Sequence, residues 1–375
     1  KVMGYRCSVC QDGICRRYAL SQDALMTKIK KNGDLVKAKN DKNDEFYTQY
    51  IDIEKEMQAY LTFNPDIFKG KTVLLPCNDL KYGEFTKYFV KNFKPLGLQK
   101  LISTSYIANQ SDGIKQAKAL ILTQENYPDD ISSLQKLPWF DLMGDGDFRS
   151  EEVTAFRDVA DIIITNPPFS LFREFLAWII SGNKCFSIIG NMNALTYKDV
   201  FPLIKDNDMW LGATISSGDR EFRVPDSYPL NAAGFRVDDE GYKYIRVKGV
   251  RWFTNIEHGQ RHKPLPLSTM SDNLKKYPKI AQKHAYQPYD NYHAIEIPKT
   301  AVIPSDYQGV MGVPISFLDK YNPDQFDILG MDFYVKAGLL ADLIVDSWQG
   351  KLDRAYLQGH RLYSRVLISH KKQGL

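Results

Sequence analysis

The chain has 375 residues, 43% of them hydrophobic and 25% charged, with a formal net charge of +4 at pH 7. This length allows a full core, as one large domain with a smaller one appended, and the composition is that of an ordinary soluble protein. No apolar stretch approaches the roughly 20 residues that cross a bilayer, which excludes a membrane-spanning role.

The first 43 residues carry ten Lys and Arg against four Asp and Glu, so we expect a basic N-terminal arm. Five cysteines and no secretion signal indicate a reducing compartment. Three of them cluster in "CSVCQDGIC", as Cys7, Cys10 and Cys15. A structural zinc site usually has four ligands and no histidine lies nearby, so a flexible leader is favoured over zinc and no metal is predicted.

Residues 44–208 alternate between apolar runs and amphipathic segments. We expect strands within 71–80, 98–107, 138–148, 160–165 and 184–191, and helical segments at 81–93, 170–180 and 196–204. Strands that alternate with helices predict right-handed crossovers and a mainly parallel sheet covered on both faces. Ligands bind beyond the carboxyl ends of such strands, so the loops at Cys77, Asp147 and Asn166 should face one crevice.

After residue 208 the pattern changes to short strand-like pieces, which predict a second, less regular module. Residues 209–290 carry thirteen Lys and Arg against nine Asp and Glu, and residues 349–375 carry six against one. In 216–225 Arg220 and Arg223 flank a phenylalanine, and 273–286 interleaves lysines with tyrosines. Such segments can contact phosphates and base edges, although a solvated surface with uneven charge would have the same composition.

The segment "ADIIITNPPFS" ends a buried strand abruptly at Asn166 and two prolines. The Asn166 side-chain oxygen and the Pro167 carbonyl are two acceptors that can take both hydrogens of one amino group. Two such bonds favour the pyramidal, nucleophilic form of an exocyclic amine. Phe169 would stack on the face of an extruded base. For an isolated tripeptide a strand cap with a core phenylalanine is the alternative; the buried strand before it and the helix after it favour the functional interpretation.

With these segments in order, the chain resembles the adenine-specific DNA methyltransferases that use S-adenosylmethionine, and most closely the EcoRI modification methylase family. The resemblance extends from about Asp44 to Gly330, and its segments are "DEFYTQ", "LLPCNDL", "KLISTSY", "GDGDF", "TNPPF", "GNMNALTY" and "GVMGVPISFLDKYNP". It implies an α/β fold with a Rossmann-like, seven-stranded methyltransferase sheet and an appended mixed target recognition module. The order of cofactor loop, NPPF and basic module looks like the gamma arrangement.

The resemblance also implies roles for individual residues. Asn166, Pro167 and Phe169 match the catalytic motif that holds the target adenine. Asp147 and Phe148 match a pair that holds and stacks on the cofactor adenine, and Asp79 is our candidate for the ribose contact because the second strand ends without an acidic residue. The full cofactor set that the resemblance implies is Phe46, Tyr47, Thr48, Pro76, Cys77, Asn78, Asp79, Asp147 and Phe148.

For DNA we expect contacts from the basic arm, from the basic module and from a turn after the fifth strand: Lys31, Lys39, Asn193, Arg220 and Arg223. The predicted domains are the arm at 1–43, the catalytic domain at 44–208 and the target recognition region at 209–375. We expect a cytoplasmic enzyme that acts as a monomer on double-stranded DNA and needs no direct contact with a cognate restriction endonuclease.

The predicted reaction is direct methyl transfer to the N6 amine of a flipped adenine, without a metal or a general base. The sequence alone leaves other acceptors open, because NPP motifs also occur in methyltransferases that act on cytosine amines, RNA or protein glutamine. A catalytically inactive DNA-binding relative is a further alternative. No Pro-Cys nucleophile stands in a matching strand loop, which argues against carbon-5 methylation through a covalent intermediate.

Overall fold

The computed structural model of the chain describes residues 47–80, 83–107, 116–215, 219–224 and 235–371. The predictions for Phe46, Lys31, Lys39 and the cysteine cluster at 7–15 lie outside the described residues. The chain forms two compact units: unit 1 comprises Lys1–Val200 and Asp208–His258, and unit 2 comprises Phe201–Asn207 and Gly259–Leu375.

Four neighbouring parallel strands form the centre of the large sheet of unit 1. Most of their side chains are apolar, and every residue of β1 and β5 is buried, as in a sheet that helices cover on both sides. These strands confirm the runs predicted at 71–80, 98–107, 160–165 and 184–191. In sheet order they are β2 (Lys100–Thr104), β1 (Thr72–Leu75), β5 (Ile162–Thr165) and β6 (Cys185–Asn191).

Two further strands extend the sheet at each side, through antiparallel pairs. The additions are β3 (Lys118–Thr123) and β4 (Phe140–Asp141) beyond β2, and β11 (Val250–Thr254) and β7 (Trp210–Leu211) beyond β6. Only β3 and β11 of the eight strands therefore run against the others, and the predicted mainly parallel α/β sheet is confirmed. The sequence did not predict β3, and it placed the β11 segment in a separate module.

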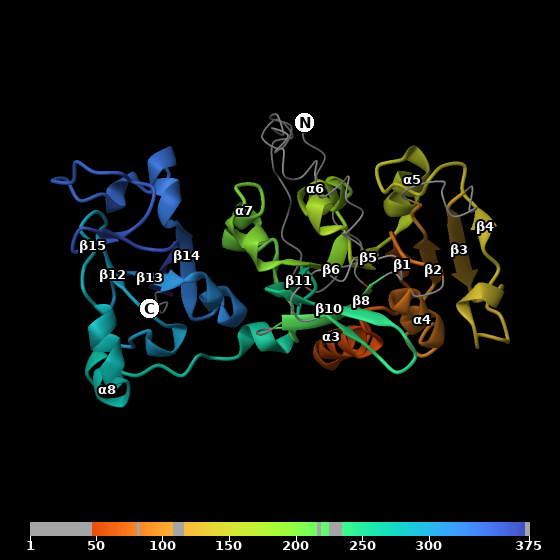
Figure 1. Cartoon of the computed structure of the whole chain (residues 1–375), viewed down its shortest axis with the longest axis horizontal. Helices are drawn as coiled ribbons and strands as arrows, with labels where there is room; N and C mark the ends of the chain where they lie inside the picture. The colour runs from red at the N-terminus through yellow and green to blue at the C-terminus, as the bar shows by residue number, and fades with distance from the viewer. Residues whose placement is uncertain (1–46, 81–82, 108–115, 216–218, 225–234, 372–375) are drawn as a thin grey trace. The chain divides into compact units, whose positions relative to one another are not determined.

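Helices cover both faces of this sheet. Figure 1 shows α3 and α4 on one side and α5 and α6 on the other, as right-handed crossovers between parallel strands require. The helix α6 confirms the amphipathic segment predicted at 170–180, whereas α3 and α5 were not predicted. The bounds are α3 (Tyr50–Phe63), α4 (Glu84–Lys91), α5 (Glu151–Val159) and α6 (Phe172–Ser181).

A small antiparallel sheet also belongs to unit 1. It has the order β8 (Asp219–Val224), β10 (Lys243–Lys248) and β9 (Arg236–Val237). Phe222 belongs to the buried cluster of unit 1 and Val247 packs against that cluster. Side chains alternate along a strand, so Arg220 lies on the same face of β8 as the buried Phe222 and Val224, whereas Glu221 and Arg223 lie on the opposite face.

Unit 2 is built on a mixed four-stranded sheet with a buried ion pair. The Glu296 carboxylate accepts from the Arg365 guanidinium at 2.7 Å and from the Tyr289 hydroxyl at 2.6 Å.

None of the described helices is both long and apolar enough to cross a membrane. The elements of unit 2 are α7 (Phe201–Lys205), α8 (Met270–Lys276), the sheet β12 (Ala294–Glu296), β13 (Val310–Pro314), β17 (Arg365–His370) and β14 (Phe326–Met331), and the hairpin β15 (Tyr356–Leu357) and β16 (His360–Arg361).

Candidate functional site

The loops that follow β1, β2 and β5 meet at the carboxyl edge of the large sheet. The Thr165 hydroxyl at the end of β5 donates to the Pro76 carbonyl at 2.5 Å. The Asn78 backbone N–H donates to the carbonyl of Thr104, the last residue of β2, at 2.8 Å. The loop after β1 is therefore fixed to the strands on both sides of it, at the edge where parallel sheets bind ligands.

This loop, residues 76–79, makes a tight turn without a glycine. Cys77 has φ of 60°, in the left-handed region that a side chain other than glycine rarely adopts. The Asn78 side-chain amide donates to the Leu75 carbonyl at 2.9 Å and to the Pro76 carbonyl at 3.3 Å. These two bonds hold the turn in place, so Cys77 keeps a conformation that glycine usually supplies.

A small pocket opens beside the turn and collects three of the predicted segments. Its lining includes Tyr47 and Thr48 before α3, Cys77 after β1, and Asn166 after β5. Thr48 is 29 residues before Cys77, and Cys77 is 89 residues before Asn166, so segments far apart along the chain converge on one cavity. The complete lining is Tyr47, Thr48, Cys77, Asn78, Asp79, Gly83, Glu84, Phe85, Thr165 and Asn166.

The polar groups of the pocket include a carboxylate and a buried hydroxyl. The Tyr47 hydroxyl donates to the Asp79 carboxylate at 3.4 Å. Thr48 is 4% exposed, and its hydroxyl has no hydrogen-bond partner among the described residues. A buried hydroxyl without a partner is costly, so its position on a pocket wall favours a polar ligand there.

Burial raises the pKa of the Cys77 thiol to about 12, with a further contribution from the Asp147 carboxylate and an opposing one from Arg149. The thiol is therefore protonated at neutral pH and is a poor nucleophile. The same interactions indicate that Asp147 is near the Cys77 turn, but neither Asp147 nor Phe148 lines the small pocket, so a crevice shared by all three loops stays a prediction.

The GDGDF loop packs tightly against the end of β2. Gly146 has φ of 78°, and a Cβ atom there would lie 2.0 Å from the Ser105 carbonyl oxygen. Only glycine allows this approach. Phe148 is 2% exposed and packs edge-on against Phe175 and Trp178. Its predicted stacking on the cofactor adenine stays a prediction, and it requires that the ring shift or present its edge.

Arg149 ties Asp147 to helix α6. Its guanidinium lies 2.5 Å from the Asp147 carboxylate and 2.8 Å from the Glu174 carboxylate. Hydrogen bonds to Asp147 raise the pKa of Arg149, with a further contribution from Glu174. The Asp147 side chain is thus held in a fixed direction by a neighbour that the sequence did not single out.

The NPPF segment leaves the buried strand β5 and enters a short 3₁₀ turn, Phe169–Leu171, before α6. Asn166 lines the pocket, and Pro167 is buried. Phe169 is half-buried and packs against the core of unit 1 with part of its surface. The rigid turn therefore presents Asn166 to the same cavity as the loop after β1.

The predicted DNA-contacting residues occupy other places in unit 1. Arg223 on β8 lies with its guanidinium 3.5 Å from the centre of the Tyr242 ring. Arg220 on the same strand lies 3.9 Å from the Asp52 carboxylate. Asn193 is exposed in a 3₁₀ turn after β6, and its backbone N–H donates to Asn191 at 2.9 Å. None of these three side chains lines the small pocket.

Four residues of the pocket were not found from the sequence: Gly83, Glu84, Phe85 and Thr165. Gly83 precedes the first residue of α4, and a Cβ atom at this position would lie 2.4 Å from the Asp79 carbonyl oxygen. The glycine in "KYGEF", directly after the predicted loop, was the available signal. Thr165 stands beside Asn166 in the motif itself. It was missed because the sequence shows it only as the last residue of a strand, not its hydrogen bond to Pro76.

The chain matches known proteins over most of its length. Residues 34–371 match the family described as "Adenine-specific methyltransferase EcoRI". The Type II methyltransferase M.EcoRI of Escherichia coli is 44% identical over 79% of this chain and 88% of its own length. The Type II methyltransferase M.MpnI of Mycoplasma pneumoniae is 34% identical over 90% and 98%, and M.MgeORF184P of Mycoplasma genitalium is 35% identical over the same shares.

No solved structure gives a significant match. The family match covers most of the chain, and all three relatives exceed 30% identity over nearly their full length. The chain belongs to the EcoRI family of adenine-specific DNA methyltransferases, which take their methyl group from S-adenosylmethionine.

Proposed function

We propose that the small pocket of unit 1 is the methyl-donor site and that Asn166, Pro167 and Phe169 hold the target adenine beside it. The observation that carries this proposal is the common lining: Thr48, Asp79 and Asn166 come from three separate segments and border one cavity. The large sheet would then be the seven-stranded methyltransferase sheet of the family, with β4 added at its edge.

The polar groups of this lining suit S-adenosylmethionine, of which the cavity, about 30 Å³ in this structure, can enclose only a part. The buried Thr48 hydroxyl has no partner among the described residues and offers a hydrogen bond to the methionine part. The Asp79 carboxylate can accept hydrogen bonds from ribose hydroxyls, and Asp147 with Phe148 would contact the adenine. S-adenosylmethionine supplies a methyl group on a positively charged sulfur. The remaining members of the proposed set are Phe46, which lies outside the described residues, Tyr47, Pro76, Cys77 and Asn78.

The chain itself contributes positioning. The Asn166 side-chain oxygen and the Pro167 carbonyl would each accept one hydrogen of the adenine amino group, which concentrates the nitrogen lone pair in the direction of the methyl group. Phe169 would stack on the base. Phe169 is partly buried and packs against the core of unit 1, which would limit the movement of its ring. No general base is required, because the proton can leave after transfer.

The test is the variant Asn166→Ala. We expect turnover to fall roughly 10²- to 10³-fold, the usual loss when one preorganised hydrogen bond to the reacting group is removed. Calorimetry should show unchanged affinity for S-adenosylmethionine. Asn166→Asp keeps an acceptor oxygen and should retain more activity than the alanine variant. Near-normal turnover of Asn166→Ala with intact cofactor binding would contradict the assignment.

For the rest of the chain we propose the domain roles that the sequence predicts. Residues 44–208 carry catalysis, 209–375 recognise the target, and the arm at 1–43, which lies outside the described residues, contacts phosphates through Lys31 and Lys39. Arg220 and Arg223 would contact phosphates or base edges of the DNA, and Asn193 would line the pocket of the flipped base. The enzyme would act in the cytoplasm as a monomer on double-stranded DNA, without direct contact with a restriction endonuclease.

A further inference from the structure

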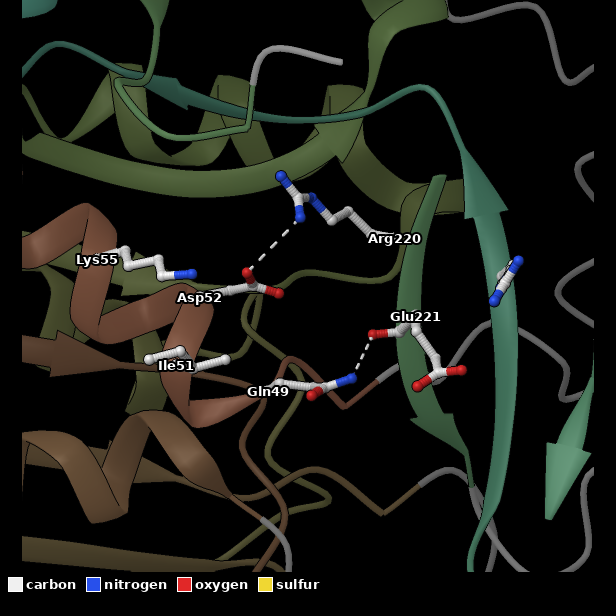
Figure 2. Close-up of a pocket in the computed structure, with 7 residues that line it drawn as sticks. Gln49, Ile51, Asp52, Lys55, Arg220 and Glu221 are labelled. Carbon is white, nitrogen blue, oxygen red and sulfur yellow. Dashed lines mark hydrogen bonds and ion pairs between the residues drawn. The ribbon is translucent and has the colours of Figure 1, made fainter. Parts of the chain in front are cut away.

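A second, larger pocket of unit 1 lies between helix α3 and the small sheet β8–β10–β9. Its volume is 670 Å³. Figure 2 shows Lys55 and Arg220 pointing into the same space from opposite sides, with Asp52 between them. We name this pocket the α3–β8 groove, and its lining is Gln49, Ile51, Asp52, Lys55, Arg220, Glu221 and Arg246.

The groove is polar. Ile51 is the one apolar side chain of its lining, and three of the other residues carry positive charge: Lys55, Arg220 and Arg246. Sites for small molecules are mostly apolar and enclosed, with a few polar groups. The lining therefore favours part of an extended, negatively charged partner over a small ligand.

Ion pairing leaves this groove positively charged. Outside the groove, Arg236 binds the Glu221 carboxylate with two bonds of 2.7 and 2.8 Å, and these bonds lower the pKa of Glu221. The remaining carboxylate, on Asp52, stands 3.9 Å from Arg220. Neither Lys55 nor Arg246 has an ion pair among the described residues. Arg246 lies opposite Glu221 on the neighbouring strand and helps to lower its pKa. The groove thus holds three cations and two carboxylates, and the contact between Arg220 and Asp52 is too long for a strong hydrogen bond.

Arg220 has a further unused donor. Its Nε atom is buried and has no acceptor among the described residues. A buried guanidinium N–H without an acceptor is costly, so a ligand oxygen in the groove would relieve that cost. The long contact with Asp52 leaves the guanidinium able to turn towards such an oxygen.

The groove is joined directly to the methyl-donor pocket through the segment 47–49. Tyr47 pairs with Arg223 on β8 through two backbone bonds, of 2.8 and 3.3 Å. Gln49 donates its side-chain amide to the Glu221 carbonyl at 3.0 Å, as Figure 2 shows. Tyr47 lines the small pocket and Gln49 lines the groove, so a group bound in the groove lies close to the donor site.

We propose that the α3–β8 groove binds a phosphate of the DNA backbone close to the target adenine, with Lys55, Arg220 and Arg246 as ligands and Asp52 as a counter-ion that the phosphate displaces. DNA presents a row of singly charged phosphates, and Lys and Arg are the usual residues that contact them. This inference depends on the DNA substrate and not on the role of Asn166, so the two can fail separately.

The first test measures binding of the full chain to a duplex that carries its methylation site, between 50 and 200 mM salt. Lys55→Gln and Arg246→Gln should each weaken binding roughly 3- to 10-fold, and each should reduce the slope of log affinity against log salt by about 0.9, the value for one lost phosphate contact. Asp52→Asn should strengthen binding, because it removes the competing carboxylate.

Lys69→Gln is the matched control, since Lys69 is 70% exposed in unit 1 and does not line the groove. Unchanged affinity for S-adenosylmethionine in all variants shows that unit 1 is intact. If the groove variants bind duplex with the affinity and salt slope of Lys69→Gln, or if Asp52→Asn weakens binding, the proposal is wrong.

The second test locates the phosphate. Single phosphates of the duplex are replaced in turn by neutral methylphosphonates, and the wild-type chain should lose affinity at one position next to the target adenine. For the double variant Lys55→Gln/Arg246→Gln, replacing that phosphate should cause no further loss of affinity. Replacing the other phosphates should weaken its binding as much as it weakens binding of the wild-type chain. Equal losses in both proteins at every position would overturn the assignment.

Discussion

Glu56 is a fully buried carboxylate in the middle of helix α3, and its partners come from distant parts of unit 1. It accepts from the Tyr60 hydroxyl at 2.8 Å and from the backbone N–H groups of Ala213 and Thr214 at 2.8 and 2.9 Å. The Thr214 hydroxyl also donates to it. Tyr60 in turn bonds Ser187 on β6 at 2.9 Å. One side chain therefore connects the central sheet, α3 and the segment that leads to β8.

The variant Glu56→Gln tests this network. An amide nitrogen would replace one acceptor oxygen and face N–H or O–H donors, so we expect the free energy of unfolding to fall by about 2–4 kcal/mol. Glu54→Gln, on the exposed side of the same helix, should change it by less than about 0.5 kcal/mol. Chemical denaturation compares the two, and similar stability of both variants would show that the buried contacts contribute little.

At the scale of residues, the sequence predicted those members of the site whose types suit the chemistry. Asn166, Asp79 and Cys77 stand in recognisable segments and line the pocket. Glu56 and Arg149 were not found, because their importance comes from partners that only the folded chain brings near. Thr165 and Gly83 were missed for the same reason, although both adjoin predicted residues.

At the scale of elements, the loop between β4 and α5 depends on one glycine. Gly146 brings the loop against the Ser105 carbonyl after β2, and it holds a positive φ. Gly144, two residues earlier, has no atom within 4 Å of the position of an added Cβ and no positive φ. The two glycines therefore form a matched pair in which only one has a steric requirement.

We expect Gly146→Ala to displace the loop and with it Asp147. Affinity for S-adenosylmethionine, measured by calorimetry, should fall roughly 10-fold or more, because small displacements of positioning groups have large effects. Gly144→Ala should bind the cofactor as the wild-type chain does. Equal affinity of the two variants would show that the loop does not contact the cofactor.

Elements with a clear local pattern of apolar residues could be predicted from the sequence, and elements without one could not. Strands β1, β5 and β6 are continuous apolar runs with clear ends, so their residues alone indicate buried strands. Helix α3 was missed because the buried Glu56 interrupts the apolar stripe of Ile53, Met57 and Tyr60. Paired residues of β11 and β6 are 59 to 67 positions apart along the chain, and no local pattern specifies such a pairing.

At the scale of the whole molecule, the path of the chain does not follow composition. Residues 201–207 belong to unit 2, after which the chain returns to unit 1 for β7 and β11 before it enters unit 2 again at Gly259. The change to short strand-like segments after residue 208 therefore predicted shorter elements correctly, but it did not indicate which unit those elements join. A boundary defined by contacts can be found only from the folded chain.

Unit 2 contains a buried carboxylate that makes its stability depend on pH. Asp332 is fully buried, and its carboxylate accepts from the Ala355 N–H at 3.2 Å. Burial raises its pKa from 3.8 to about 6, against the opposing hydrogen bonds and the nearby Arg354. The folded unit thus prefers the protonated acid, so this contribution is fully present below about pH 4 and is lost as the pH rises through about 6.

Asp332→Asn removes this titration and keeps an acceptor for Ala355. Two units of pKa correspond to about 3 kcal/mol, so the variant should gain stability over the wild-type chain by up to about that amount as the pH rises from 4 to 8. Because the chain has two units, we would follow hydrogen exchange of β13 and β17 peptides, comparing the proteins at each pH so that intrinsic exchange rates cancel. The exposed Asp346→Asn should show no such trend. A stability difference that does not change with pH would mean that Asp332 does not titrate in this range.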